Sequence, residues 1–308
     1  MSFELTILGC SSASPTSHRN PSAQVLQHNE QLFLIDCGEG TQVQLRKRKI
    51  KFSKINHIFV SHLHGDHYFG LIGLLSTFHL TGRQNDLHIY APAKLKEIID
   101  LQFKASGTWL EYKLHFHAHD FENPGIIFED DKLTVETIRL KHRIPTSGFV
   151  FREKSRPRSI NRKMIDAFEV PVYELNKIKQ GADYIDEEGK IVPNRKLTFD
   201  PPAPVSYAYC SDTMFYEPVI SNVKGVDCLY HEATFKEDMR ERAVKSFHST
   251  TIDAATIAKK ASVGQLIIGH YSARYNDLQE LLEEAQTVFK QTALGEEGKS
   301  YLIEKTQE

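Results

Sequence analysis

Apolar and polar positions follow two rhythms along most of the chain. Short β-rich runs bounded by turn residues predict strands, and stretches with apolar positions at helical spacing predict helices between them. The predicted strands are residues 3–8, 31–36, 56–61, 87–90, 133–140, 206–210, 228–230 and 266–268. The predicted helices are residues 41–49, 69–80, 93–104, 252–260 and 278–289. Strands that alternate with helices are typical of an α/β fold.

Residues 152–204 interrupt this alternation. Prolines and glycines stand there between clusters of charged residues, a composition that disfavours long regular elements. The pattern predicts an inserted arm at 152–204 within a single domain that spans residues 1–308.

Composition narrows the class of protein. The 38 Lys and Arg residues nearly balance the 40 Asp and Glu residues, giving a formal charge of −2, so a polyanion could be met only by a local patch. With 40% hydrophobic and 25% charged residues, the chain fits a globular class and not a disordered or membrane class. The four cysteines show no C-x-x-C spacing. We therefore expect a cytoplasmic, reduced protein without membrane contact.

The strongest chemical signal is the segment Ser61-His62-Leu63-His64-Gly65-Asp66-His67, directly after an apolar strand. On an extended segment His62 and His64 project the same way, and Gly65 permits a sharp turn that brings Asp66 and His67 round. Imidazoles and carboxylates together suit two cations of the zinc type. A histidine-rich surface tract is the alternative interpretation.

Two metal ions need more ligands than this segment supplies. His142, Asp212 and His270 each follow an apolar run, and Asp212 could bridge the ions with its two oxygens. Each of the three could instead be a structural polar residue, but together with the first cluster they predict a dinuclear site.

This ligand pattern resembles the metallo-β-lactamase superfamily, whose fold is a four-layered αβ/βα sandwich. Further segments are similar to the ribonuclease Z branch, the tRNA 3′-processing endonucleases, and the resemblance covers about residues 5–276. Those segments are Leu8-Gly9-Cys10-Ser11-Ser12-Ala13-Ser14-Pro15-Thr16, Arg19-Asn20, Asp36-Cys37-Gly38-Glu39-Gly40-Thr41-Gln42, His231-Glu232-Ala233-Thr234, His248-Ser249-Thr250 and Ser272-x-Arg274-Tyr275.

The resemblance implies a hydrolase that cuts precursor tRNA after the discriminator base and leaves a tRNA 3′-hydroxyl and a trailer 5′-phosphate. It implies two Zn²⁺ per subunit, although Mn²⁺ or Fe²⁺ would also suit the ligands, and a homodimer that acts on RNA and not on DNA. By resemblance, His62, His64 and His142 hold one ion, Asp66, His67 and His270 hold the other, and Asp212 lies between them.

The resemblance also assigns roles in catalysis. Asp66 is expected to accept a proton from the attacking water, and His248, oriented by Glu232, to stabilise or protonate the departing oxygen. For Glu232 and His248 a buried ion pair is the alternative. Residues 152–204 are expected to grip tRNA, and the basic segments 141–163 and 46–51 could contact phosphates.

Two other functions stay open at this point. The same site could hydrolyse small cyclic nucleotides or other phosphate esters, or the chain could be a non-catalytic RNA-binding scaffold with structural metals. Two nearby features are interpreted as structural. The segment His115-Phe116-His117-Ala118-His119 is expected to be an exposed strand face. The segment Tyr68-Phe69-Gly70-Leu71 is expected to pack in the core as part of a following helix, with substrate stacking as the alternative.

Overall fold

The computed structural model describes residues 3–305 of the chain, which form two compact units. The larger unit contains the residues up to 129, residues 134–152 and the residues from 205 onward. The smaller unit contains residues 130–133 and 153–204. All of the predicted metal ligands belong to the larger unit.

The first sheet of the larger unit has the strand order β18-β1-β2-β3-β4-β5-β6. Its strands are β1 (Phe3–Gly9), β2 (Ala23–His28), β3 (Gln31–Ile35), β4 (Ile55–Phe59), β5 (Leu87–Ala91), β6 (Leu114–Ala118) and β18 (Ser300–Leu302). Strands β3 to β6 are parallel to one another. Buried parallel strands read as nearly continuous apolar runs, which is why the sequence pattern located β3, β4 and β5, whereas β6 is partly exposed.

The second sheet has the order β17-β16-β15-β14-β9-β8-β7. Its strands are β7 (Ile126–Glu129), β8 (Leu133–Arg139), β9 (Ser147–Glu153), β14 (Ser206–Cys210), β15 (Cys228–Glu232), β16 (Gln265–Gly269) and β17 (Thr292–Leu294). Strands β14, β15, β16 and β17 are parallel. Loops that follow parallel strands therefore gather at one edge of this sheet.

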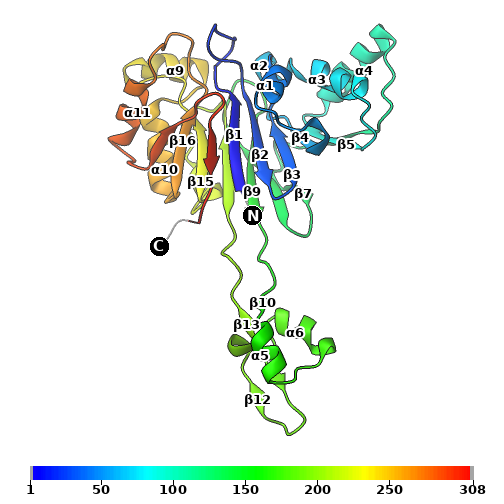
Figure 1. Ribbon diagram of the computed structural model, residues 1–308. Helices are drawn as coiled ribbons and strands as arrows, with labels where there is room; N and C mark the ends of the chain where they lie inside the picture. Colours follow the sequence, from blue (N-terminus) through cyan, green and yellow to red (C-terminus); the bar gives the residue numbers. More distant parts are fainter. Residues whose placement is uncertain (1–2, 306–308) are drawn as a thin grey trace. The chain divides into compact units, whose positions relative to one another are not determined.

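Helices lie on the outer side of each sheet, which gives four layers (Figure 1). Beside the first sheet these are α1 (Thr41–Lys47), α2 (Gly65–Tyr68), α3 (Leu71–Leu80) and α4 (Lys94–Ser106); beside the second they include α8 (Pro218–Asn222), α9 (Arg240–Ser246), α10 (Thr251–Ala261) and α11 (Gln279–Gln286). The predicted α/β sandwich is confirmed. Among residues 3–305, no helix has the length and apolar character that crossing a membrane requires.

Aromatic side chains join the two sheets. The ring of Phe33 on β3 lies 5.6 Å from Phe128 and 6.0 Å from Phe151 of the opposite sheet, centroid to centroid. Phe59 on β4 lies 5.6 Å from Phe149 in the same way. These are edge-to-face arrangements, and all of the rings except the partly buried Phe128 are buried. They fix the separation of the sheets whose ends carry the predicted site.

The smaller unit has its own apolar core, formed by Ile165, Val170, Ile178, Tyr184, Val192 and Leu197. Its elements are short: β10 (Ser159–Ile160), α5 (Arg162–Ala167), α6 (Leu175–Lys179), β11 (Tyr184–Ile185), β12 (Ile191–Val192), α7 (Asn194–Leu197) and β13 (Thr198–Phe199). The predicted arm at 152–204 thus coincides closely with a compact unit that packs around its own side chains.

Candidate metal centre

The predicted metal ligands follow strands of both sheets. His62 and His64 come after β4, His142 after β8, Asp212 after β14 and His270 after β16. Asp212 and His270 have φ angles of 56° and 58°, in the left-handed region that residues with a side chain rarely adopt. Such strained backbone concentrates at functional sites, because only a constraint from the surrounding structure maintains it.

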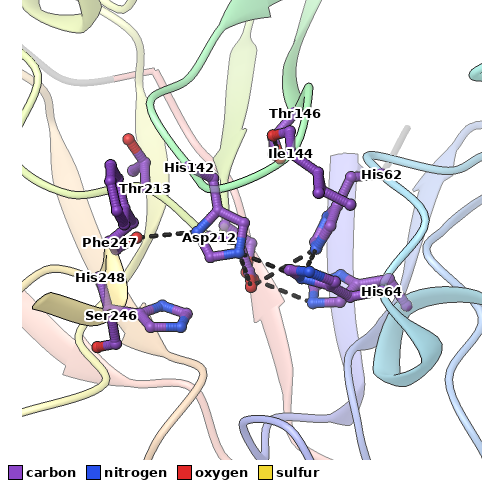
Figure 2. Close-up of polar contacts among 12 residues, drawn as sticks. His62, His64, His142, Ile144, Thr146, Asp212, Thr213, Ser246, Phe247 and His248 are labelled. Carbon is purple, nitrogen blue, oxygen red and sulfur yellow. Dashed lines mark hydrogen bonds and ion pairs between the residues drawn. The ribbon is translucent and has the colours of Figure 1, made fainter.

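The first group of donors converges on one point (Figure 2). Nδ1 of His64 lies 3.0 Å from Nε2 of His62 and 3.2 Å from Nε2 of His142. Oδ2 of Asp212 lies 3.6 Å from Nε2 of both His62 and His142. Four donors at about 2.0–2.2 Å from a tetrahedral ion are separated by roughly 3.3–3.6 Å. The first group therefore has the size of a tetrahedral metal site.

The second group shares Asp212 with the first. Its Oδ1 lies 3.0 Å from Nε2 of His67 and 3.1 Å from Nε2 of His270, while Oδ2 of Asp66 lies 3.6 Å from each of these nitrogens. Within residues 3–305, Nε2 of His67 and of His270 are buried and make no well-formed hydrogen bond. Buried polar atoms rarely lack a partner, so these two nitrogens fit a metal ion at this point.

In four of the histidines, His62, His67, His142 and His270, a protein group contacts Nδ1, which leaves Nε2 to face the donor group. His142 Nδ1 donates to the carbonyl oxygen of Phe247 at 2.9 Å, as Figure 2 shows. The other Nδ1 contacts are His62 with Ser61 Oγ at 3.0 Å, His67 with Asp36 Oδ2 at 2.7 Å and His270 with Thr234 Oγ1 at 3.0 Å.

The protonation states of these side chains suit metal binding. Burial lowers the pKa of His62, His64 and His142, so each imidazole is neutral and has a free lone pair. Burial alone would raise the pKa of the Asp212 carboxyl, but the surrounding imidazoles, above all His270, hold it well below its usual range. The Asp212 carboxylate is therefore ionised.

Asp36 contacts His67 at the site, and we did not predict this from the sequence. In the sequence analysis Asp36 was only one residue of a segment similar to the ribonuclease Z branch. It is fully buried, accepts hydrogen bonds from the Ser61 backbone at 2.8 Å and from the Tyr209 hydroxyl at 2.6 Å, and lies 2.7 Å from His67 Nδ1. Asp36 directly follows the apolar run of β3, just as Asp212 follows an apolar run. This position in the sequence could have indicated that Asp36 lies at the site.

Glu232, which is fully buried, and His248, which is partly buried, form a pair beside the two donor groups. His248 Nδ1 lies 2.8 Å from Glu232 Oε1, and Glu232 also accepts hydrogen bonds from the backbone of Thr213 at 2.7 Å and of Ser249 at 3.1 Å. Burial lowers the pKa of His248, but the Glu232 carboxylate outweighs this and raises it to about 9. The imidazole is thus protonated at neutral pH.

The position of His248 is fixed by the start of α10. Thr250 caps this helix: its hydroxyl accepts from the Asp253 backbone at 3.2 Å, and the Asp253 carboxylate accepts from the Thr250 backbone at 3.1 Å. This reciprocal pair is a capping box. The segment His248-Ser249-Thr250 therefore combines a helix cap with a side chain that lines the site.

A cavity of about 410 Å³ opens over the donors. Residues from both donor groups line it together with Ala13, Glu39, Phe69, Arg143 and His248. The predicted core position of Phe69 is wrong, because its side chain is 56% exposed and lies at this cavity. Tyr68 is partly buried against the core.

The histidines of β6 lie outside both donor groups. His115 Nε2 lies 2.8 Å from Asp86 Oδ2, and His117 Nε2 lies 2.9 Å from His88 Nδ1. These contacts occur at an exposed strand face, as the sequence predicts. His119 differs: it is buried and its Nε2 lies 3.0 Å from the Val60 carbonyl oxygen.

The two-sheet sandwich and the paired donor groups at its edge define a hydrolase of the metallo-β-lactamase fold. Ribonuclease Z of Bacteroides fragilis is 51% identical over 295 residues, which cover 96% of this chain and 97% of that protein. Ribonuclease Z of Phocaeicola vulgatus is 51% identical over 302 residues, 98% of each chain. The chain belongs to the ribonuclease Z family.

Solved structures agree with this assignment. The human tRNase Z, short form, is 27% identical with a TM-score of 0.70, over 97% of this chain and 99% of that chain. The metallo-β-lactamase fold protein YhfI of Bacillus subtilis shares the fold, with a TM-score of 0.67 at 19% identity, over 97% of this chain and 98% of that chain. Residues 3–157 also match the sequence model of the family described as Anti-Pycsar protein Apyc1.

Proposed function

We propose that this chain is a metal-dependent endoribonuclease that removes the 3′ trailer from precursor tRNA after the discriminator base. The products are a tRNA with a 3′-hydroxyl and a trailer with a 5′-phosphate. One observation carries the proposal for this family member: Asp212 gives one oxygen to each donor group, and His248, which contacts Glu232, lines the cavity over these donors. A site of this kind can activate a water and assist a departing oxygen across one phosphodiester.

The donor sets fit two divalent cations, and we propose zinc, although manganese or iron would suit the same atoms. His62, His64 and His142 would hold one ion, Asp66, His67 and His270 the other, with Asp212 shared. When bound, two such ions lower the pKa of a water toward neutrality and neutralise charge on the phosphate oxygens.

Asp66 is proposed as the acceptor of the proton from the attacking water. Its Oδ2 accepts a hydrogen bond from the backbone of Ala13 at 2.8 Å, which holds the carboxylate at the cavity. The neighbouring imidazoles of His67 and His270 keep the pKa of Asp66 below its ordinary value although burial opposes this. The carboxylate is therefore ionised and free to accept a proton.

His248 is proposed to donate a proton to the departing 3′-oxygen of the tRNA. Glu232 accepts from its Nδ1, so that Nε2 is the nitrogen left to face the substrate. Glu232 is a positioning residue, because it acts through His248.

Metal content tests the proposed ligand set. We expect about two divalent ions per chain in zinc-loaded protein. The zinc content is measured by elemental mass spectrometry after gel filtration. Asp212→Ala should lose at least one of them, because it removes a donor from both groups. His117→Ala is the matched control and should retain both ions; equal losses in the two variants would contradict the assignment.

The compact unit at residues 130–133 and 153–204 is proposed to bind the body of the tRNA. From Lys154 to Lys163 this unit carries five Lys and Arg residues and no acid. Within the unit, Arg158, Arg162 and Lys179 line a cavity of about 560 Å³. Cations at such positions attract phosphates, which dominate the affinity of proteins for nucleic acids.

Deleting residues 152–204 should separate two activities. We expect the KM for precursor tRNA to rise at least about tenfold, with a weaker dependence of KM on salt concentration, because phosphate contacts are lost. Hydrolysis of the small diester bis(p-nitrophenyl) phosphate should change far less. Equal losses on both substrates would argue against tRNA binding by this unit. A wild-type protein that hydrolyses only the small diester would favour the alternative of a small-substrate phosphodiesterase.

The chain is further proposed to form a homodimer. Leu80 at the end of α3, Leu101 on α4 and Trp109 are 81%, 68% and 86% exposed. The backbone of Glu111 donates to His79 Nδ1 at 3.3 Å, which places the Trp109 segment against the end of α3. Exposed Leu80 and Trp109 thus belong to neighbouring segments, and exposed apolar side chains are typical of a protein interface.

Sedimentation velocity tests the dimer. The wild type is expected to sediment as a dimer, and Trp109→Ala to shift toward monomer at the same concentration, because buried aromatic residues dominate interface energies. Leu302→Ala, at another exposed apolar side chain, should leave the distribution unchanged. A wild type that remains monomeric at micromolar concentration would contradict the proposal.

A further inference from the structure

An aromatic ring faces the cavity over the donor groups. Phe69 directly follows α2, the helix that carries Asp66 and His67, and its side chain is 56% exposed. Among the described residues that line this cavity, Phe69 supplies its only phenyl ring, and the other aromatic side chains there are histidines of the site. A flat apolar surface therefore borders a cavity that is otherwise lined mainly by polar and charged side chains.

The local sequence holds the ring in this place. The backbone of Phe69 donates to the carbonyl oxygen of Gly65 at 2.9 Å, one helical turn earlier. Side chains of a helix point back toward its N-terminus, so the ring lies over Gly65. A Cβ atom at Gly65 would stand 2.1 Å from Cε2 of Phe69. Gly65 has no left-handed φ angle; the absence of its side chain instead makes room for the ring.

We infer that Phe69 is a stacking platform for one of the two bases that flank the scissile phosphate. This inference rests on the proposed function. A phosphate placed between the donor groups brings its neighbouring nucleotides into the same cavity, whose volume of about 410 Å³ lies within the range of small-ligand sites, about 300–1,000 Å³. A nucleobase is the part of RNA with a flat apolar face that matches an exposed phenyl ring.

Stacking has a consequence for specificity. Every base presents a π-face, so a phenyl platform accepts any of the four bases. Phe69 would thus position the RNA strand beside the metal centre in precursors whose sequences differ. The body of the tRNA, and not the stacked base, would determine which RNA is bound. Phe69 is a positioning residue in this scheme, since it contacts the substrate away from the reacting atoms.

The test combines variants of the protein with variants of the substrate. The value of kcat/KM is measured for wild type, Phe69→Ala and Phe69→Tyr on three precursors: intact, abasic at the discriminator, and abasic at the first trailer nucleotide. Stacking of one base contributes about 1–3 kcal/mol, so Phe69→Ala should lose about 5- to 140-fold on the intact precursor. Phe69→Tyr keeps the ring and should remain close to wild type.

The abasic substrates decide whether the ring acts on a base. On the precursor that lacks the stacked base, wild type and Phe69→Ala should cleave at nearly equal rates, and this also identifies which nucleotide is stacked. The same fold-loss on all three precursors would overturn the inference, because the ring would then support only the fold or the metal ligands. No loss on the intact precursor would overturn it as well.

The outcomes separate this inference from the function on which it rests. If wild type leaves every precursor intact, the proposed function fails. If wild type cleaves and Phe69→Ala cleaves equally well, only the role of Phe69 fails. Leu302→Ala, a change at an apolar side chain that is also 56% exposed, provides the matched control and should behave as wild type.

Discussion

Replacing Asp66 with alanine is expected to reduce kcat for precursor-tRNA cleavage by at least about 10⁴-fold. A positioned general base contributes about 10²–10⁴-fold. Asp66→Ala also removes the oxygen that lies 3.6 Å from Nε2 of both His67 and His270, and with it one donor of the second group. Single-turnover cleavage of a 3′-extended precursor, with the metal content of each preparation measured, determines the loss.

Two further variants separate the two roles of Asp66. Asp66→Asn keeps an oxygen donor but cannot accept the proton, so it should retain more metal than Asp66→Ala while remaining strongly impaired. Asp86→Ala changes a carboxylate outside the site and should cleave as wild type does. If Asp66→Asn with full metal content kept wild-type kcat, the carboxylate would not be the proton acceptor.

Replacing His248 with alanine is expected to lower kcat by about 10²–10⁴-fold, the usual contribution of a general acid. The reason is the proton on its imidazole, which Glu232 stabilises through the 2.8 Å contact with Nδ1. Glu232→Gln should show a smaller loss, because an amide can still orient the ring but stabilises its charge less. Both variants should retain wild-type metal content.

A modified substrate tests the direction of this proton. In a precursor with a bridging 3′-sulfur at the cleavage site, the leaving group is a thiolate, which departs without protonation. The loss caused by His248→Ala should then shrink at least about tenfold, since the variant lacks only the acid. An equal loss on the oxygen and sulfur substrates would contradict the proton-donor role and favour a purely structural ion pair.

Much of the fold could be predicted because its central strands are buried on both faces. The strand at Ser206–Cys210 was predicted at its exact limits, and the helices α1, α3, α4, α10 and α11 within a few residues. Strand β2 was missed because its inward positions include polar side chains. Gln24, for instance, is buried and accepts a hydrogen bond from the Tyr207 hydroxyl. Such a pair is visible only once the two sheets are brought together.

The site was predicted in part for a related reason. A proposed ligand that directly follows an apolar run, such as Asp212 or His270, is recognisable along the chain. The groups that orient the ligands are not, because they come from distant segments. The carbonyl oxygen of Phe247 that holds His142 carries no side-chain signal at all. Phe69 was misjudged because apolar residues after a metal motif usually continue into the core, whereas here Gly65 leaves room for the ring at the surface.

The most direct test of the proposed function is to determine the ends that zinc-loaded wild-type protein produces from a 3′-extended precursor tRNA. The predicted result is a single cut after the discriminator base, which yields a tRNA with a 3′-hydroxyl and a trailer with a 5′-phosphate. Cleavage at other positions, a 3′-phosphate on the tRNA, or an intact precursor in the presence of bound metal would contradict the proposal.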